Sequence, residues 1–295
     1  MRGVGVAQKR KIPTVRLRRL AAELRRLRAE SGMTREDVTE RTGINGTTLY
    51  RIEGVQARPQ KRTLMALLDL YGVNEPHRGE IIAMSQGASQ QGWLRPYHGE
   101  LPEEYTTFIS FESEAWEVRN YQSLFIPGLL QTEDYARAVI RGTLPLATTD
   151  EVEARVRARI ERQATLAGER PLRLWATMDE AALHRAVGGP AVMRAQMQHL
   201  LDASQQPHIR LQVIPFAAGA HPGMAGSFAL LVFADREEPE IIYVDSMAGE
   251  FFLETEVEVR RYSGMFDHLM AQALSPDDTH RLIVTLSDNA KKWEV

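Results

Sequence analysis

The sequence predicts two folded domains: an all-α N-terminal domain and a larger α+β C-terminal domain with a mainly antiparallel sheet. Its 295 residues are 43% hydrophobic and 25% charged, which suits one small and one ordinary globular domain. Apolar residues first recur with helical spacing, and runs typical of strands follow only after a stretch rich in Ser, Gln and Gly. The expected organisation is a basic flexible arm at 1–14, a helical domain at 15–84, a linker at 85–100 and the α+β domain at 101–295.

The first predicted helix of the N-terminal domain carries one apolar stripe. Leu17, Leu20, Leu24 and Leu27 recur at the spacing that places them on one side of a helix. The arginines between them lie mostly outside this stripe, and Gly32 is expected to end the helix.

Two short helices joined by a sharp turn are predicted next. Thr34, with Asp37 three residues later, forms a capping box that starts a helix running to about Thr42. Gly43 can adopt the left-handed conformation that ends this helix, and Asn45 can cap the following one. The pattern is typical of a helix-turn-helix.

The second helix of this pair would present a polar face. Leu49 and Ile52 have the spacing of core residues, which leaves Gly46, Thr47, Tyr50 and Arg51 facing outward. A recognition helix presents such N-terminal residues to base edges, and the forked donors of arginine suit guanine O6 and N7.

Residues Leu17 to Val73 resemble the lambda-repressor-like, XRE-type helix-turn-helix family. The run after the second helix, IEGVQARP, is similar to the segment that follows the recognition helix in that family. Thr39 departs from the small alanine usual there, and Gly46 offers no side chain at the first turn of the recognition helix.

The resemblance implies double-stranded DNA as a partner. Arg58, Lys61 and Arg62 would lie beside phosphates after the recognition helix, and the other contacts would come from the helix pair itself. A charged helical module of this kind could instead bind proteins, with solvated arginines. The predicted DNA-binding residues are Arg35, Asn45, Thr47, Thr48, Tyr50, Arg51, Arg58, Lys61 and Arg62.

Charge distribution favours DNA binding over protein binding. Residues 1–90 contain 17 Lys and Arg against 9 Asp and Glu, a net charge of +8, whereas the whole chain carries −3 and its remainder therefore −11. A basic domain attached to an acidic one is the distribution expected when only the first binds phosphates. The basic arm, with Lys9, Arg10 and Lys11, could lie along the DNA backbone or minor groove, or be an unstructured tail.

Composition excludes several other classes of protein. The chain contains no cysteine, so disulfides, thiolate catalysis and thiolate metal sites are excluded. The N-terminus lacks the apolar stretch of a secretory signal, and the longest apolar run, Phe228 to Ala234, is too short to span a bilayer. We expect a cytoplasmic protein without membrane contact.

The second domain is predicted to mix helices and strands. Helices are expected at 75–84, which completes the first domain, and then at 102–111, 132–140, 151–166 and 256–274, with a final short helix after Pro276. The helix at 151–166 carries Arg155, Arg157, Arg159 and Arg162 among glutamates, which favours a solvated or domain-interface helix. Strands are expected at 116–123, from Leu172, and at 209–216, 227–234, 240–245 and 249–254, the last four as antiparallel hairpins.

Four phrases, IPGLLQTEDYARA, ARIERQATL, VIPFAAGAHPGMAGSF and YVD, resemble the C-terminal domain of WhiJ-like actinobacterial regulators. The resemblance covers nearly all of residues 100–290. It implies an antitoxin-like transcriptional regulator that works with a small BldB-like partner protein, and it supplies no catalytic residues.

Enzyme motifs are not found in the second domain. The loop from Ala218 to Ser227 is glycine-rich and contains His221, but it lacks the residue order of a P-loop and no G-x-S-x-G elbow occurs. We interpret it as a glycine-rich hairpin connection. The remaining histidines lack metal-ligand spacing, and Glu112 and Glu114 point to different faces. No catalytic residue, cofactor or metal is predicted.

These observations predict a sequence-specific DNA-binding transcriptional regulator, acting as a homodimer because one such domain covers only a half-site. Its C-terminal domain would sense a small-molecule effector or a partner protein. Two alternatives remain: an interaction protein that mainly sequesters a partner, and an enzyme that its helix-turn-helix delivers to DNA.

Overall fold

The structure, a computed structural model, describes residues 15–87, 97, 100–234, 239–247 and 249–288. The chain divides into two compact units, an N-terminal unit at residues 1–95 and a C-terminal unit at 96–295. The predicted arm at 1–14 and most of the predicted linker at 85–100 lie outside the described residues.

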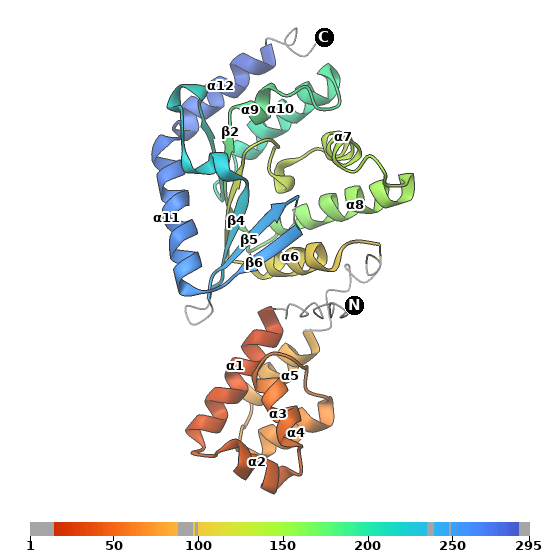
Figure 1. Ribbon diagram of the computed structural model, residues 1–295, viewed down its shortest axis with the longest axis vertical. Coiled ribbons are helices and arrows are strands. Elements are labelled where there is room, and N and C mark those ends of the chain that lie inside the picture. The colour runs from red at the N-terminus through yellow and green to blue at the C-terminus, as the bar shows by residue number, and fades with distance from the viewer. Residues whose placement is uncertain (1–14, 88–96, 98–99, 235–238, 248, 289–295) are drawn as a thin grey trace, which may run out of the picture. The chain divides into compact units, whose positions relative to one another are not determined.

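The N-terminal unit is all-α (Figure 1), as predicted. Leucines of the first helix pack with Val38, Leu49 and Ile52 in one fully buried cluster, to which the fourth helix adds Leu64 and Leu67. The apolar stripe read from the sequence therefore forms the core of this unit. Its helices are α1 (Val15–Glu30), α2 (Arg35–Thr42), α3 (Gly46–Glu53), α4 (Lys61–Leu70) and α5 (His77–Gly87).

Local capping signals set the α2–α3 turn. The Asp37 amide donates to Thr34 Oγ1 at 3.1 Å and the Thr34 amide donates to Asp37 Oδ2 at 2.8 Å, which is the predicted capping box. Gly43 has a φ of 70°, and Asn45 Oδ1 accepts from the Thr47 amide at 2.9 Å. The structure therefore confirms the capping box, the left-handed glycine and the Asn45 cap at the residues where the sequence predicts them.

The last helix of this unit lies later in the chain than predicted. It begins at His77 rather than at Glu75, because Glu75 precedes Pro76 and the residue before a proline disfavours helical conformation. It continues through Gly87, so Ser85 to Gly87 belong to a helix and not to the linker. Ser85 is buried and its carbonyl accepts from Arg58, and these contacts outweigh the linker-like composition.

The C-terminal unit is built around a six-stranded mixed sheet in the order β3-β2-β1-β4-β5-β6. The β1–β2 and β2–β3 pairs are parallel, whereas the three pairs from β1–β4 to β5–β6 are antiparallel. The predicted α+β fold with a mainly antiparallel sheet is confirmed. The strands are β1 (Glu117–Gln122), β2 (Arg173–Asp179), β3 (Ile209–Ile214), β4 (Phe228–Val232), β5 (Ile241–Ser246) and β6 (Gly249–Leu253).

The hairpin predicted between β3 and β4 is wrong. Helical crossovers follow β1 and β2, so β3 pairs with β2 in parallel at one edge, while β4 lies beyond β1. The chain from 215 to 227 must therefore pass the carboxyl ends of β2 and β1. The helices are α6 (Glu103–Glu114), α7 (Glu133–Thr143), α8 (Thr149–Glu161), α9 (Ala181–His184), α10 (Pro190–Ser204), α11 (Glu256–Gln272) and α12 (Pro276–Asp288), with short 3-10 turns η2 (Gly128–Leu130) and η3 (Arg162–Leu166).

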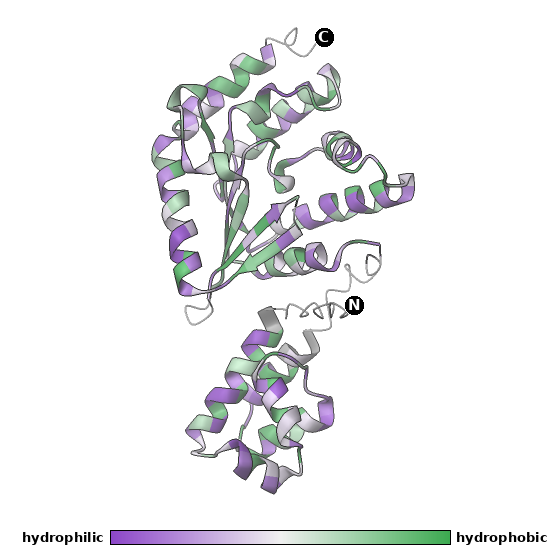
Figure 2. Cartoon of the chain, viewed as in Figure 1, coloured by the Kyte–Doolittle hydropathy of each residue, from purple (hydrophilic) through white to green (hydrophobic). Residues whose placement is uncertain are grey.

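Helices cover both faces of the sheet. Helix α11 runs along one face, and α6, α7 and α8 lie on the other (Figure 1). On the α11 side, Tyr121, Phe228 and Leu230 of the sheet bury themselves against Phe266 and Leu269. The strands are largely hydrophobic, whereas α8 alternates hydrophilic and hydrophobic residues along its length (Figure 2).

The loop from 215 to 227 is packed against the strand ends. His221 is 3% exposed at its side chain, and its Nε2 lies 3.1 Å from Asp179 Oδ2 at the end of β2. A Cβ atom at Gly223 would lie 2.3 Å from the Tyr121 ring, so only glycine allows this close approach. Gly223 therefore serves packing over the strand ends rather than a hairpin turn.

Candidate nucleic-acid interface

Helix α3 presents a polar face while its other side is anchored in the core. Leu49 and Ile52 are buried, whereas Thr47, Thr48 and Arg51 are exposed. The Tyr50 ring is 54% exposed, which is a large apolar surface for a lone helix face. A helix of this kind has the form of a recognition helix, with donors and an aromatic ring available for base edges and phosphates.

A buried carboxylate fixes α3 to its neighbours. Glu53, at the end of α3, is only 1% exposed, and its two oxygens meet Arg28 Nε and Arg35 Nε at 2.6 Å each. Arg28 also donates to the Met33 carbonyl, and Arg25 donates to the Glu53 carbonyl. Ion pairs between hydrogen-bonded, buried groups hold a single geometry, so α1, α2 and α3 are locked together at this point.

The same ion pairs place Arg35 beside the exposed ring. The Arg35 guanidinium carbon lies 5.4 Å from the centroid of the Tyr50 ring, within the range of a cation–π contact. Arg35 is therefore held between Glu53 and Tyr50. Arg35 can therefore contact DNA only through those N–H groups that do not contact Glu53 or Tyr50.

The segment after α3 folds back onto the end of that helix. The amides of Gln56 and Ala57 donate to the Arg51 carbonyl at 2.7 and 3.1 Å. Val55 has a φ of 60°, a left-handed conformation that is unusual for a β-branched residue and costs backbone strain. The compact loop fixes the start of α4 relative to the recognition helix.

The cations predicted to meet phosphates fall into two groups. Lys61 and Arg62 are exposed in the first turn of α4, and Gln60 at the N-cap makes no side-chain hydrogen bond to that turn. Exposed amides and cations at a helix N-terminus favour an anion. Arg58, by contrast, donates to the Ser85 carbonyl of α5, so part of its guanidinium supports the fold.

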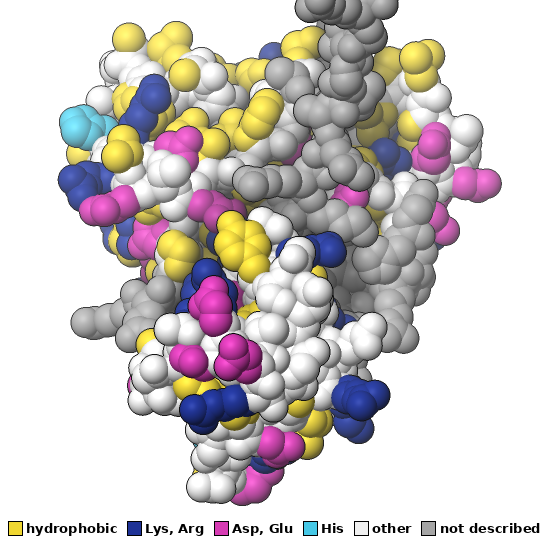
Figure 3. Space-filling view, turned by 60° about the horizontal axis from the view of Figure 1, so that its bottom comes forward, with side chains coloured by type: hydrophobic (Ala, Val, Ile, Leu, Met, Phe, Trp, Pro, Cys, Tyr) yellow, Lys and Arg dark blue, Asp and Glu magenta, His cyan; other side chains and the backbone are white. Residues whose placement is uncertain are grey.

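The nine predicted residues therefore divide by role. Thr47, Thr48, Tyr50 and Arg51 form one exposed face of α3, and Lys61 and Arg62 lie at the start of α4. The remaining three, Arg35, Asn45 and Arg58, each make at least one contact that stabilises the domain itself. On the N-terminal unit as drawn in the lower part of Figure 3, basic and acidic side chains are interspersed, so the excess of positive charge is not one continuous field on that face.

Sequence reasoning missed the role of Glu53. The sequence marks Glu53 only as part of the run IEGVQARP after the second helix, and it predicts that the arginines of the first helix lie mostly outside the core. A signal was present: Glu53 directly follows the buried Ile52, and a carboxylate at such a position needs cationic partners. Nothing local identifies Arg28 and Arg35, 25 and 18 residues away, as those partners.

Metal and membrane sites are not part of the described structure. Within the described ranges, no group of three or more His, Cys, Asp or Glu side chains could hold a metal ion. Over the same residues, no helix has both the length and the apolar character needed to cross a bilayer.

Two family models match the chain. A model described as "Domain of unknown function (DUF5753)" matches residues 105–285, which is most of the C-terminal unit. The chain belongs to the DUF5753 family. A second model, described as "Helix-turn-helix domain", matches residues 19–81 and supports an XRE-like DNA-binding regulator. Searches of curated proteins and of solved structures returned no match to this DUF5753 protein.

We predict that Glu53→Ala loosens the helix-turn-helix. Removing one partner of a buried ion pair leaves charges uncompensated, and since Arg35 is partly exposed we expect a cost of about 3 kcal/mol. In hydrogen–deuterium exchange of the full chain, the amides of α1, α2 and α3 should exchange about a hundredfold faster in this variant than in the parent chain.

Glu40→Ala is the matched control, since Glu40 is an exposed carboxylate of α2. Its exchange should equal that of the parent chain. Equal exchange in the Glu53 and Glu40 variants would show that the buried carboxylate does not lock these helices.

Proposed function

We propose that this DUF5753 protein is a sequence-specific DNA-binding transcriptional regulator. The single observation that carries the proposal is the exposed face of α3, with Arg51, Tyr50 and two threonines, held rigidly from behind by Glu53. Direct readout needs side chains fixed to within a fraction of an ångström, and a locked helix supplies that. The exposed cations at the start of α4 would then contact the phosphates beside the same groove.

The proposed regulator binds its operator as a homodimer. One domain of this size covers only a half-site, and paired half-sites on one face of the duplex suit a two-fold symmetric protein. The cations at the start of α4 give each copy an orienting contact with the backbone. Two copies would therefore recognise an inverted repeat.

The C-terminal unit has the proposed role of controlling DNA binding. Its resemblance to WhiJ-like regulators favours an antitoxin-like protein that responds to a small partner of the BldB-like kind or to a small-molecule effector. We propose binding rather than catalysis, because two acid–base groups with nearly inaccessible side chains already pair with groups of the chain itself. His221 faces Asp179, and Glu112 faces Arg162 at 2.9 Å.

Selection from randomised duplexes tests the proposal. We expect the full chain to enrich one inverted-repeat sequence and to retain it in the presence of heparin at low ionic strength. If the chain binds duplexes no better than heparin and enriches no sequence, the proposed function is wrong.

Arg51 should determine sequence preference. Arg51→Ala is expected to lose about 1–3 kcal/mol of discrimination between the selected operator and an operator changed at one base pair. Arg51→Lys keeps the charge but not the fork, so it should retain non-specific affinity and still lose discrimination. Binding titrations on both duplexes measure this, and an unchanged preference in both variants would exclude a base contact by Arg51.

Lys61 should contribute affinity without preference. Lys61→Ala is expected to weaken binding to every duplex and to reduce the slope of log K against log salt by about one unit. Arg26→Ala is the control, because Arg26 pairs with Glu23 and Glu30 within α1. A Lys61 variant whose salt slope equals that of the control would not contact a phosphate.

A further inference from the structure

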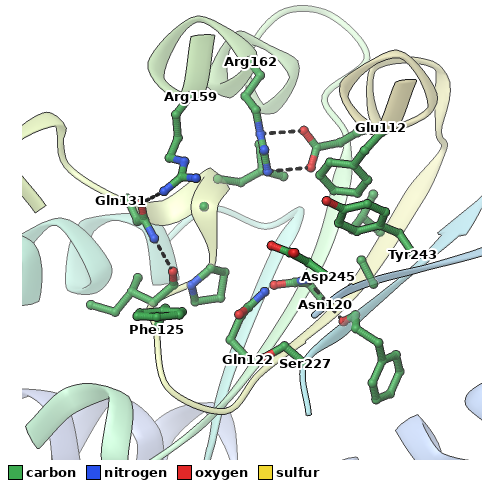
Figure 4. A pocket seen from close by; sticks show the side chains of 18 of the residues that line it. Glu112, Asn120, Gln122, Phe125, Gln131, Arg159, Arg162, Ser227, Tyr243 and Asp245 are labelled. Carbon is green, nitrogen blue, oxygen red and sulfur yellow. Dashed lines mark hydrogen bonds and ion pairs between the residues drawn. The ribbon is translucent and has the colours of Figure 1, made fainter. Parts of the chain in front are cut away.

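A cavity lined by polar and apolar side chains lies between the sheet and the helices of the C-terminal unit. Its volume is about 240 Å³, and its walls come from β1, β4 and β5 on one side and from α6, α8, η3 and the segment 125–131 on the other. Arg159 and Arg162 enter from the helical side, whereas Asn120, Gln122 and Asp245 lie on the sheet side (Figure 4). Nothing in the sequence pattern had identified this cavity.

One of the two arginines is neutralised inside the wall. Arg162 is 6% exposed, its Nε and Nη2 lie 2.9 and 3.0 Å from the carboxylate oxygens of Glu112, and its Nη1 donates to the Tyr105 hydroxyl at 3.0 Å. The expected solvated or domain-interface helix at 151–166 is therefore wrong for Arg162, which is buried inside the C-terminal unit. Helix α8 stops at Glu161 and the 3-10 turn carries Arg162 inward to its carboxylate partner.

The second arginine, Arg159, forms no ion pair with a carboxylate of the described residues. Arg159 Nη1 donates to Gln131 Oε1 at 3.1 Å, and Gln131 is oriented for this contact because its Nε2 donates to the Ile126 carbonyl at 2.7 Å. Arg159 Nε is buried and makes no hydrogen bond to any residue that the structure describes. The Gln131 oxygen is neutral, so the positive charge of Arg159 is available to an anionic ligand in the cavity.

The charge of Arg159 acts on other groups of the cavity. Burial raises the pKa of the Tyr105 hydroxyl, but Arg159 and Arg162 together outweigh burial and hold that pKa below its ordinary value. Burial also raises the pKa of the Asp245 carboxyl, which Arg159 lowers only in part. Positive potential from Arg159 thus reaches across the cavity to Asp245, which forms no ion pair within the described part of the chain.

The sheet side offers hydrogen bonds and one negative charge. Asn120 and Gln122 alternate along β1, so both point toward the cavity while Tyr121 between them points to α11. Asn120 Nδ2 donates weakly to the Phe228 carbonyl at 3.4 Å, which leaves its oxygen as an acceptor. Asp245 lines the cavity from the end of β5, and the residue is exposed although its carboxyl group is partly desolvated, so it lies at the mouth.

We propose that this cavity binds a small amino carboxylate, a molecule of the size of a free amino acid, with its carboxylate on Arg159 and its ammonium on Asp245. A volume of about 240 Å³ accommodates a molecule of the size of a free amino acid. A single guanidinium that forms no ion pair with the described carboxylates matches one carboxylate of a ligand. Asp245 would repel a second negative charge, which disfavours phosphate and dicarboxylates.

The proposal deepens the proposed function, because it names the effector class that the C-terminal unit would sense. Ligand binding to the full chain can be measured without DNA. Duplex selection can be measured without ligand. Failure of one measurement therefore leaves the other intact.

Calorimetric titration of the full chain with the common free amino acids, one at a time, tests the site. At least one should bind, and the 2-oxo acid of the same carbon skeleton should bind about tenfold more weakly because it lacks the ammonium. Arg159→Gln should lose affinity for that amino acid by about tenfold or more. Arg155→Gln is the matched control on the same helix, since Arg155 donates to the Glu151 carbonyl outside the cavity.

Asp245→Asn provides a second variant at the exposed mouth, where a change of side chain leaves the core intact. It should reduce the preference for the amino acid over its 2-oxo acid to about twofold or less. The proposal is overturned if no amino acid binds, if the 2-oxo acid binds as tightly, or if the Arg159 and Arg155 variants bind the amino acid equally.

Discussion

The buried Glu53 carboxylate is the constraint on which the DNA-binding face depends. Two arginines from two different helices meet one carboxylate that has almost no contact with water, and a third arginine binds the carbonyl of the same residue. Removing such a charge from water is unfavourable unless both oxygens are engaged in good geometry. The site is therefore formed only when α1, α2 and α3 take one arrangement, and that arrangement presents Arg51 and Tyr50 outward.

The C-terminal unit also contains a buried ion pair, and a second arginine beside it forms no ion pair with a described carboxylate. Glu112 and Arg162 neutralise each other in the wall between α6 and η3, so this pair specifies the packing of a helix on a 3-10 turn. Arg159, one turn earlier, reaches the same cavity and donates to an amide oxygen, and no carboxylate of the described residues forms an ion pair with it. The difference between the two arginines separates a structural ion pair from a group that can serve a ligand.

Features set by neighbouring residues could be predicted from the sequence, and features set by distant residues could not. The Thr34 capping box, Gly43 and the Asn45 cap each act within three residues, and the structure shows all of them. The parallel position of β3 and the pairing of Glu112 with Arg162 depend on chain crossovers over tens of residues, which no local pattern encodes. The same holds for Glu53, whose partners lie on helices that precede it, and for the cavity.

The position of Arg159 explains how a ligand bound in the cavity would change the contacts of the surrounding helices. Gln131, which accepts from Arg159, also offers its carbonyl to Gln163 Nε2 at 2.7 Å. The next residue, Thr132, caps α7, and its backbone amide donates to Gln196 Oε1 of α10 at 2.7 Å. A carboxylate that competes with Gln131 for Arg159 would release one of the contacts that hold this segment. That segment contacts α7, α8 and α10, so a change in the contacts of the Arg159 guanidinium would affect the packing of three helices. Such a change in packing is what a ligand needs in order to alter the surface of the domain.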